Sequence, residues 1–259
     1  MFHFTKAVLM VGGRIIASYF AWMRKFAKHP EKYPFEKRYF KLQHLLKKLN
    51  NGLSVTYHTQ DVEKLPDETC LIVSNHLSAF DPLLLISAFD KPCTFVAKTE
   101  LKNKPFAGKI IQGIDGLFID RKDLKQSLRV MMKVEEDLKQ RNKNWIIYPE
   151  GTRNKDQLHT VAEFHHGTFR PAVKAEVPIV PVAVYGTFRP LKESPQFKKY
   201  PVFIKVLDPI YPSEYKNMTT QELAKIVQDK IQRTISFELR KLDHQEMSGD
   251  KKYRFNDII

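Results

Sequence analysis

The sequence predicts an α/β fold, with a largely parallel or mixed sheet flanked by helices and an N-terminal two-helix appendage in front of it. Short apolar, β-branched runs, which are typical of buried strands, alternate with stretches of helical periodicity. With 259 residues and 42% hydrophobic content, the chain is long enough for one large domain with a sizeable core. The first fifty residues differ from the rest in their charge.

The net charge of +14 indicates an anionic partner, which can be nucleic acid, a membrane surface, or an acidic substrate or carrier. The first 50 residues carry eleven Lys and Arg against two acidic residues, so the basic surface is mostly N-terminal. Cys70 and Cys93 are the two cysteines, and Cys70 lies in a predicted buried strand. A disulfide framework is therefore not expected, and a reducing cytosolic setting fits.

Residues 5–28 are predicted to form one amphipathic helix despite two adjacent glycines. The basic residues fall on one side of a helical projection, and the apolar residues form a wide arc on the other. The basic set is Lys6, Arg14, Arg24, Lys25 and Lys28, and the apolar set includes Ile15, Ile16, Tyr19, Phe20, Trp22, Met23 and Phe26. A basic stripe beside aromatic anchors is typical of a helix that lies in a membrane interface.

A transmembrane span is the alternative for this segment. Seventeen residues separate Lys6 from Arg24, at the lower limit for crossing a bilayer, and Arg14 lies in the middle. A central Arg costs about 2.5–3.5 kcal/mol on insertion scales, which favours a helix that lies on the membrane. A helix packed on the protein's own core is a third alternative, against which the all-basic polar face argues.

A second helix is predicted from residue 36 to residue 50, after Pro30 and Pro34 and before Asn51-Gly52. It is also basic, and its apolar face consists of Tyr39, Leu42, Leu45, Leu46 and Leu49. We therefore expect residues 1–52 to form a membrane-association motif and residues 53–259 to form the α/β domain.

The rest of the chain alternates strands with helices. Strands are predicted at 53–57, 70–73, 94–97, 116–121, 145–148, 178–185 and 202–206. Helices are predicted at 82–89, along the apolar positions from Leu124 to Leu138, at 167–175, and after the capping box formed by Thr219 and Glu222. The prolines in 178–185 favour an edge strand or the entry to one.

A histidine and an aspartate follow the strand at 70–73. His76 comes directly after the strand end, and Asp81 precedes Pro82 at the start of a helix, where Asp is a good N-cap. An aspartate that accepts a hydrogen bond from one imidazole nitrogen leaves the other nitrogen free to act as a base. The spacing therefore suggests a dyad in which His76 activates a substrate hydroxyl. Alternatively, Asp81 only caps its helix and His76 is a loop histidine.

Polar residues also lie at the ends of three further predicted strands. They are Lys98, Arg121, and the run Glu150-Gly151-Thr152-Arg153. Ligands bind at the carboxyl ends of strands in open α/β sheets, and Arg and Lys at such ends suit an anion such as phosphate. Gly151 allows the backbone to approach a ligand closely. Each cation alone is more simply a solvated surface charge, but their shared placement favours a site.

These stretches together resemble the glycerolipid acyltransferase family, and within it the 1-acyl-sn-glycerol-3-phosphate acyltransferases. Four motifs match in the family's order and span about residues 70–185: Asn75-His76-x-x-x-x-Asp81, Gly116-Leu-Phe-Ile-Asp-Arg121, Tyr148-Pro-Glu-Gly-Thr-Arg153 and Val177-Pro-Ile-Val-Pro-Val182. The third motif commonly begins with Phe. Here Tyr148 replaces it, at a position that we expect inside a strand.

The resemblance implies an enzyme of phospholipid biosynthesis that transfers a fatty acyl group from a thioester to the sn-2 hydroxyl of lysophosphatidic acid, giving phosphatidic acid. His76 is then the base and Asp81 its orienting partner. Lys98, Arg121 and Arg153 hold the phosphate, and Glu150, Gly151 and Thr152 shape the glycerol site. No metal or organic cofactor is implied. Residues 53–259 become the acyltransferase domain of a peripheral protein on the cytoplasmic face of the cell membrane.

Several alternatives stay open at this point. The donor can be an acyl carrier protein or acyl coenzyme A, and the acceptor can be a different lysophospholipid. A non-catalytic basic protein that binds membranes is another class. Nucleic acid is not expected, because the aromatic residues of 1–50 lie on the apolar face, away from the Lys and Arg beside which stacking platforms are built. A metal site at His159, Glu163, His165 and His166 lacks a firm ligand spacing, and Phe164, His165 and His166 more simply form a polar turn before Gly167.

Overall fold

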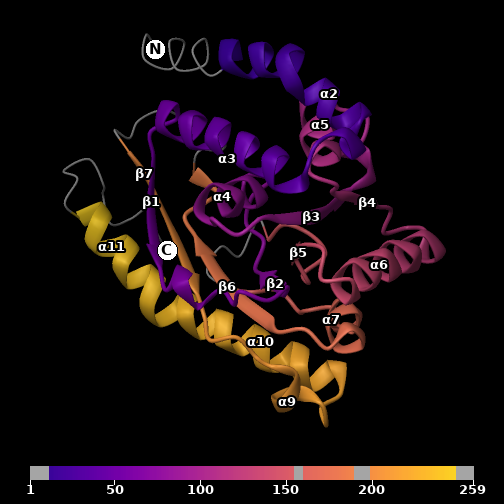
Figure 1. The fold of residues 1–259 in the computed structure, drawn as a ribbon. Helices are drawn as coiled ribbons and strands as arrows, with labels where there is room; N and C mark the ends of the chain where they lie inside the picture. Colours follow the sequence, from indigo (N-terminus) through magenta and orange to yellow (C-terminus); the bar gives the residue numbers. More distant parts are fainter. Residues whose placement is uncertain (1–11, 155–159, 190–198, 249–259) are drawn as a thin grey trace.

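In the computed structural model, residues 12–154, 160–189 and 199–248 are described. They form a seven-stranded mixed sheet with helices on both faces, as Figure 1 shows. The strands are β1 (Val55–Gln60), β2 (Leu71–Ser74), β3 (Cys93–Lys98), β4 (Leu117–Ile119), β5 (Asn144–Ile147), β6 (Ile179–Tyr185) and β7 (Tyr200–Val206). The predicted α/β class is therefore confirmed.

The strand order is β1-β7-β6-β2-β5-β3-β4. Strands β6 and β7 pair antiparallel, and the other neighbouring strands pair parallel. Consequently β2, β5, β3 and β4 all point the same way, and the loops that follow them meet at one edge of the sheet. This is the edge where the sequence places the polar residues.

Strand β6 is not at an edge, so that part of the prediction is wrong. It lies between β2 and β7, and all seven of its residues are buried. Pro181 pairs with Val73 of β2, and its carbonyl accepts from the Leu207 amide. Pairing with β7 begins only at Val182. The strand therefore accommodates a residue without an amide donor at the point where its second ladder starts.

The longer helices are α2 (Arg24–Lys28), α3 (Phe35–Gly52), α4 (Asp81–Ala88), α5 (Pro105–Gly113), α6 (Leu124–Lys139), α7 (Arg170–Ala175), α10 (Thr220–Thr234) and α11 (Arg240–Ser248). Helices α5 and α11 were not predicted from the sequence. The capping box at Thr219 and Glu222 is present with both of its hydrogen bonds. Short 3₁₀ turns, two π-helical segments and the four-residue α9 (Pro212–Tyr215) complete the described elements.

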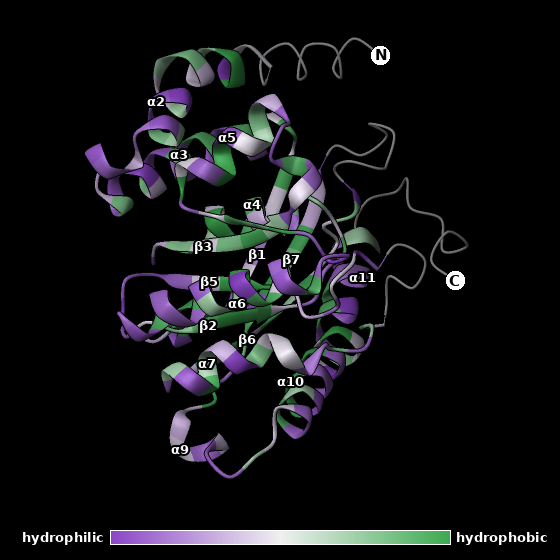
Figure 2. Ribbon diagram, turned by 90° about the vertical axis from the view of Figure 1, so that its right-hand side faces the viewer, coloured by the Kyte–Doolittle hydropathy of each residue, from purple (hydrophilic) through white to green (hydrophobic). Residues whose placement is uncertain are grey.

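Two hydrophobic clusters fill the two faces of the sheet. Alternate residues of β2 divide between them, with Ile72 in one cluster and Leu71 and Val73 in the other. The first cluster contains residues of α3 and α4, and the second contains residues of α6, α7 and α10. Because both faces are covered, β2 is apolar throughout, as buried parallel strands are. Figure 2 shows the hydrophobic strands lying inside the more polar helices.

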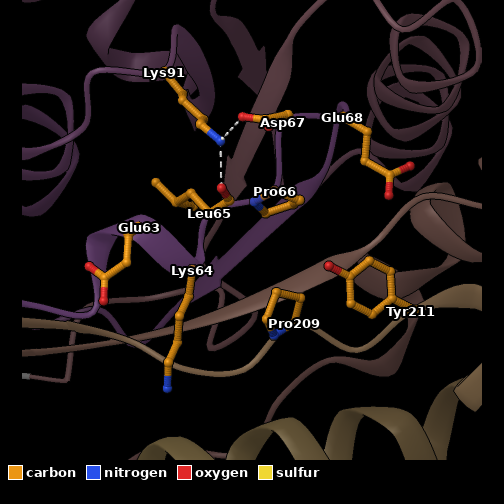
Figure 3. A pocket seen from close by; sticks show the side chains of 9 residues that line it. All are labelled: Glu63, Lys64, Leu65, Pro66, Asp67, Glu68, Lys91, Pro209 and Tyr211. Carbon is orange, nitrogen blue, oxygen red and sulfur yellow. Dashed lines mark hydrogen bonds and ion pairs between the residues drawn. The ribbon is translucent and has the colours of Figure 1, made fainter.

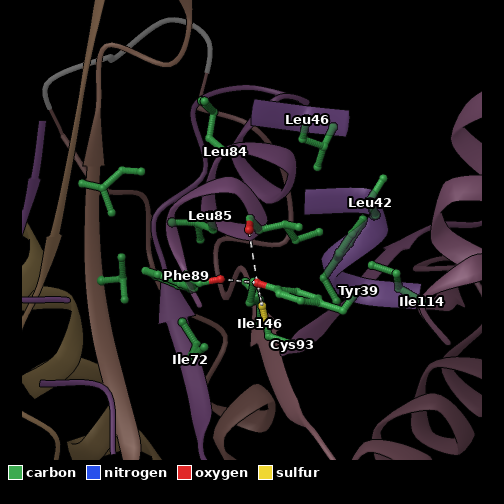
Figure 4. Packing of buried hydrophobic residues seen from close by; sticks show 14 of the residues in the cluster. Tyr39, Leu42, Leu46, Ile72, Leu84, Leu85, Phe89, Cys93, Ile114 and Ile146 are labelled. Atoms are coloured by element: carbon green, nitrogen blue, oxygen red, sulfur yellow. Dashed lines mark hydrogen bonds between the residues drawn. The ribbon is translucent and has the colours of Figure 1, made fainter. Parts of the chain in front are cut away.

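The second predicted N-terminal helix, α3, packs into the first cluster. Its Tyr39 is fully buried, and the hydroxyl lies 2.8 Å from the carbonyl oxygen of Phe89, as Figure 4 shows. The carbonyl oxygen of Ile86 is the second acceptor, 3.2 Å away. Arg38 binds Asp115 through two hydrogen bonds of 2.7 and 2.8 Å. The boundary at residue 52 stays a prediction, but the apolar face of α3 is covered by the protein itself and is not free for a membrane.

The first predicted helix is helical over residues 12–28, with a π-helical segment at Tyr19–Met23, and its part before residue 12 lies outside the described residues. Its apolar side is divided. Met23 and Phe26 are buried, whereas Ile16 and Phe20 are 52% and 63% exposed. Nowhere in 12–154, 160–189 or 199–248 is there a helix with the length and apolarity that a membrane crossing needs.

Replacing Tyr39 by Phe should lower the free energy of unfolding by about 1–2 kcal/mol, because the buried carbonyls of Ile86 and Phe89 then lose the one hydroxyl donor that they share, and among the described residues only that of Phe89 keeps another donor, Gln43. Urea denaturation of both proteins measures this difference. The matched control is Tyr148→Phe, since the Tyr148 hydroxyl is also buried but has no hydrogen-bond partner among the described residues. Equal destabilisation by Tyr39→Phe and Tyr148→Phe would show that the hydrogen bonds of the Tyr39 hydroxyl do not stabilise the fold.

Candidate active site

His76 and Asp81 form a close pair after β2. Nδ1 of His76 lies 2.7 Å from Oδ2 of Asp81, and the same oxygen accepts from the amides of Leu77 (2.8 Å) and Ser78 (2.9 Å). The Asp81 side chain is fully buried, while that of His76 is 14% exposed. A carboxylate that accepts from Nδ1–H fixes the tautomer in which Nε2 carries a lone pair.

Asp81 is not the N-cap that the sequence analysis expected. The N-cap position belongs to Phe80, and Asp81 is the first residue of α4. Its carboxylate turns back onto the His76 loop, so that the alternative in which Asp81 only caps its helix is wrong. The short loop between β2 and α4 is therefore organised around this one carboxylate.

Asn75 fixes the strand end from the other side. Its amide nitrogen donates to the Val184 carbonyl (3.0 Å), and its amide oxygen accepts from the Val184 amide (2.9 Å). These bonds join the residue before His76 to the buried strand β6. No role was predicted for Asn75, although its place directly before His76 in a matched motif was a signal.

Tyr148 lies against His76. The two rings stack with centroids 4.3 Å apart and planes inclined by 28°. Strand β5 ends at Ile147, so Tyr148 follows the strand, and the expectation of a position inside it is wrong. Burial, and then the charge of Asp81, raise the pKa of the Tyr148 hydroxyl well above its usual value, so it stays neutral.

Glu150 binds two separate loops. One carboxylate oxygen accepts from the His76 amide (2.6 Å), and the other accepts from the Ala162 amide (3.0 Å). Burial raises the pKa of Glu150 to about 7, and the two backbone hydrogen bonds oppose that shift. Its predicted role in shaping the glycerol site stays a prediction. In this arrangement its carboxylate orders the backbone of the site.

Gly151 adopts a φ of +66°, which favours glycine. A Cβ at this position would lie 3.0 Å from Cδ2 of His165, whose own amide donates to the Pro149 carbonyl. The following Thr152 and Arg153 are exposed, and the Asn154 amide donates to the His76 carbonyl (2.8 Å). Glycine therefore lets this loop fold back over the His76 strand end.

Lys98 and Arg121 lie at the ends of neighbouring strands. Lys98, the last residue of β3, pairs with Ile119, the last residue of β4. Its ammonium lies 3.1 Å from Glu100. The pKa of Glu100 is lowered first by a backbone hydrogen bond, then by the hydrogen bond from Lys98, and further by the charges of Lys98 and Arg121. Partial burial lowers the pKa of Arg121, although it remains a cation. The two cations thus form one group on the edge that carries His76.

The family model described as Acyltransferase matches residues 54–185, about half of the chain. This chain belongs to the acyltransferase family. The match contains His76, Asp81, Lys98, Arg121 and the run from Glu150 to Arg153, which favours an enzyme over a non-catalytic protein that binds membranes.

Two similar proteins indicate the group of acyltransferases to which this chain belongs. A probable 1-acyl-sn-glycerol-3-phosphate acyltransferase of Mycoplasma pneumoniae is 30% identical over 88% of this chain and 87% of its own length. The 1-acyl-sn-glycerol-3-phosphate acyltransferase of Saccharomyces cerevisiae is 29% identical over 67% of this chain and 57% of its own. The chain is thus a member of the 1-acyl-sn-glycerol-3-phosphate acyltransferase family.

A solved structure shares the fold. The crystal structure of the 1-acyl-sn-glycerophosphate (LPA) acyltransferase PlsC from Thermotoga maritima superposes with a TM-score of 0.67, covering 92% of this chain and 93% of that one at 24% identity.

A surface pocket of about 630 Å³ in the acyltransferase lies away from the His76 site. Its lining comes from the segment that precedes β2, from Lys91 before β3, and from Pro209 and Tyr211 near the start of β6 (Figure 3). These residues lie at the amino ends of the parallel strands, opposite His76. The described residues contain no group of three or more His, Cys, Asp or Glu that could hold a metal ion.

The pKa of Glu150 gives a pH-dependent stability. Because the folded acyltransferase binds the Glu150 proton more tightly than the unfolded chain, this group stabilises the fold below about pH 4.5 and loses that effect up to about pH 7. The difference in free energy of unfolding, wild type minus Glu150→Gln, should therefore decrease as the pH rises from about 4.5 to about 7. Below and above this range the difference should be constant. Denaturation at a series of pH values measures it, and a difference that grows with pH would contradict the assignment.

Proposed function

We propose that this acyltransferase transfers a fatty acyl group from a thioester donor to the sn-2 hydroxyl of 1-acyl-sn-glycerol-3-phosphate, giving phosphatidic acid, with His76 as the general base. The observation that carries the proposal is the buried carboxylate of Asp81 on Nδ1 of His76, 2.7 Å away. It leaves Nε2 as the proton acceptor of a side chain that is 14% exposed, at the sheet edge where ligands bind in this class of fold.

The reaction needs one proton transfer in each direction. Nε2 of His76 takes the proton of the acceptor hydroxyl as that oxygen attacks the thioester carbonyl, and Asp81 stabilises the imidazolium that forms. When the tetrahedral intermediate collapses, the C–S bond breaks and the imidazolium returns the proton to the thiolate. The products are the new ester and a free thiol, and no cofactor takes part.

Replacing His76 by Ala should lower kcat by about 10²- to 10⁴-fold, the usual contribution of a general base. Initial rates with lysophosphatidic acid and an acyl thioester measure this, and the thermal midpoint establishes that the variant is folded. His166→Ala is the matched control, because His166 is exposed and bonds only to Thr220 among the contacts described. Near-normal turnover in a folded His76→Ala protein would rule out the mechanism.

Lys98, Arg121 and Arg153 are proposed to bind the phosphate of the acceptor. Lys98 and Arg121 follow adjacent parallel strands, and Arg153 follows the exposed loop after Gly151. An acceptor with a dianionic phosphate suits three cations at one edge, and Arg can bind two phosphate oxygens at once.

Each of the variants Arg153→Ala, Arg121→Ala and Lys98→Ala should raise the KM for lysophosphatidic acid by about 10-fold or more, since a charge-assisted hydrogen bond contributes about 1.5–3 kcal/mol. Arg153→Ala should have the largest effect. Kinetics with lysophosphatidic acid and with monoacylglycerol, which lacks the phosphate, measure the change in preference. Lys174→Ala on α7 is the control, and unchanged acceptor kinetics in all three variants would refute the phosphate site.

The first helix is proposed to hold the enzyme on the cytoplasmic leaflet as a peripheral protein. Ile16 and Phe20 are exposed beside Arg24, whose guanidinium lies 5.9 Å from the Phe20 ring centroid. Exposed apolar side chains next to cations suit an anionic membrane surface, where each Lys or Arg contributes about 1 kcal/mol.

The double variant Ile16→Glu, Phe20→Glu should lose most of its binding to anionic vesicles, because two exposed apolar anchors become charged. Cosedimentation with vesicles measures this, and raised salt should weaken but not abolish binding of the wild type. Alkaline carbonate should strip the wild type from membranes. If it stays in the pellet, residues 5–28 cross the bilayer and the peripheral assignment is wrong.

A further inference from the structure

Helix α6 carries apolar residues that its packing does not use. Leu124, Leu128 and Met132 are 82%, 50% and 59% exposed, and their spacing of four residues places them along one face. Val130, Val134 and Leu138 lie on a different face of the same helix and are buried, and Val134 and Leu138 belong to the second hydrophobic cluster. The apolar positions from Leu124 to Leu138 that predicted this helix therefore divide into a buried set and an exposed set.

Basic side chains flank the open face. Arg121 and Lys122 directly precede α6, and Lys125 and Arg129 lie beside the stripe. Lys122, Lys125 and Arg129 are exposed and form no ion pair within the ranges that the structure describes, whereas Arg121 interacts with Glu100. In contrast, Lys133 and Lys139 further along the helix pair with Glu136 and Glu135. The first half of α6 thus combines exposed Leu124 and Leu128 with Lys125 and Arg129, and the acidic N-cap Asp123 offsets only part of the positive charge.

This surface begins at the edge of the sheet that carries His76. Strand β4, which precedes α6, is the third strand from β2 in the order β2-β5-β3-β4. Three strand spacings of about 4.8 Å place the start of α6 about 14 Å to the side of the His76 strand. In Figure 1, α6 lies at the right-hand margin of the molecule, below α5. A partner that binds there can therefore reach the His76 edge of the sheet with a flexible arm of its own.

The composition of the face favours a protein over a lipid surface. Membrane-interface helices use aromatic anchors, and these lie on residues 19–26, which pack with the first cluster on the other face of the sheet. Met and Arg are enriched at protein interfaces, and Met adapts to the shape of a partner. The positive charge calls for an acidic partner.

We propose that the first half of α6, centred on Leu124, Leu128, Lys125 and Arg129, is the docking surface for an acidic acyl carrier protein that delivers the thioester to His76. The proposal rests on the proposed acyl transfer and adds to it the identity of the donor and the place where the donor binds.

The test compares two donors, fatty acyl carrier protein and fatty acyl coenzyme A, at one lysophosphatidic acid concentration. In the variant Lys125→Glu, Arg129→Glu, the KM for the carrier-protein donor should rise at least tenfold, while kcat and the KM for acyl coenzyme A stay within twofold. Leu128→Asp should also raise the KM for the carrier-protein donor, because it places a charge in the apolar stripe. Lys174→Glu on α7, an exposed lysine on the same side of the sheet, is the control and should change neither donor.

A binding measurement tests the docking surface independently of acyl transfer. Calorimetric titration of the full-length enzyme with unacylated carrier protein should give binding that the double variant weakens at least tenfold. Failure of the wild type to bind carrier protein, or equal changes for both donors, overturns the docking surface even if acyl transfer from acyl coenzyme A is normal. Loss of vesicle binding in the double variant, with carrier-protein binding unchanged, assigns the face to the membrane and also overturns the proposal. Absence of turnover with both donors refutes the acyl transfer, while the titration still decides the docking.

Discussion

The buried carboxylate of Asp81 is the constraint on which the site depends. One of its oxygens accepts from the His76 ring and from two consecutive backbone amides, so the loop and the imidazole are oriented by the same group. A fully buried carboxylate is stable only when such donors replace water. The same contacts that make Asp81 tolerable inside the protein therefore fix the tautomer of His76 that can accept a proton.

The surrounding structure holds this loop from several directions. Asn75 ties the strand end to β6, Glu150 joins the His76 amide to the loop at Ala162, and the Tyr148 ring stacks on the imidazole. These contacts come from β5 and β6, the two neighbours of β2 in the sheet. The pairing of three adjacent parallel strands thus determines where the base lies, and the helices on both faces fix the strands.

The sequence was sufficient for the elements whose signal is local. The apolar runs predicted the strands, and the polar residues directly after them predicted the edge of the site. The pairing of His76 with Asp81 was also predictable, because only five positions separate them. The central place of β6, the burial of α3 and the contact between Tyr148 and His76 depend on pairing between distant segments, which periodicity does not encode. For α6, periodicity located the helix, but tertiary packing decided which of its apolar residues are covered.

The central claim is that His76 activates the acceptor hydroxyl directly, without an acyl group passing through the enzyme. Initial rates measured while both the thioester and lysophosphatidic acid are varied test this most directly. The account predicts intersecting double-reciprocal lines and no acyl adduct by mass spectrometry when the thioester alone is added. Parallel lines, together with an acylated side chain formed without acceptor, indicate a covalent intermediate and would contradict the account.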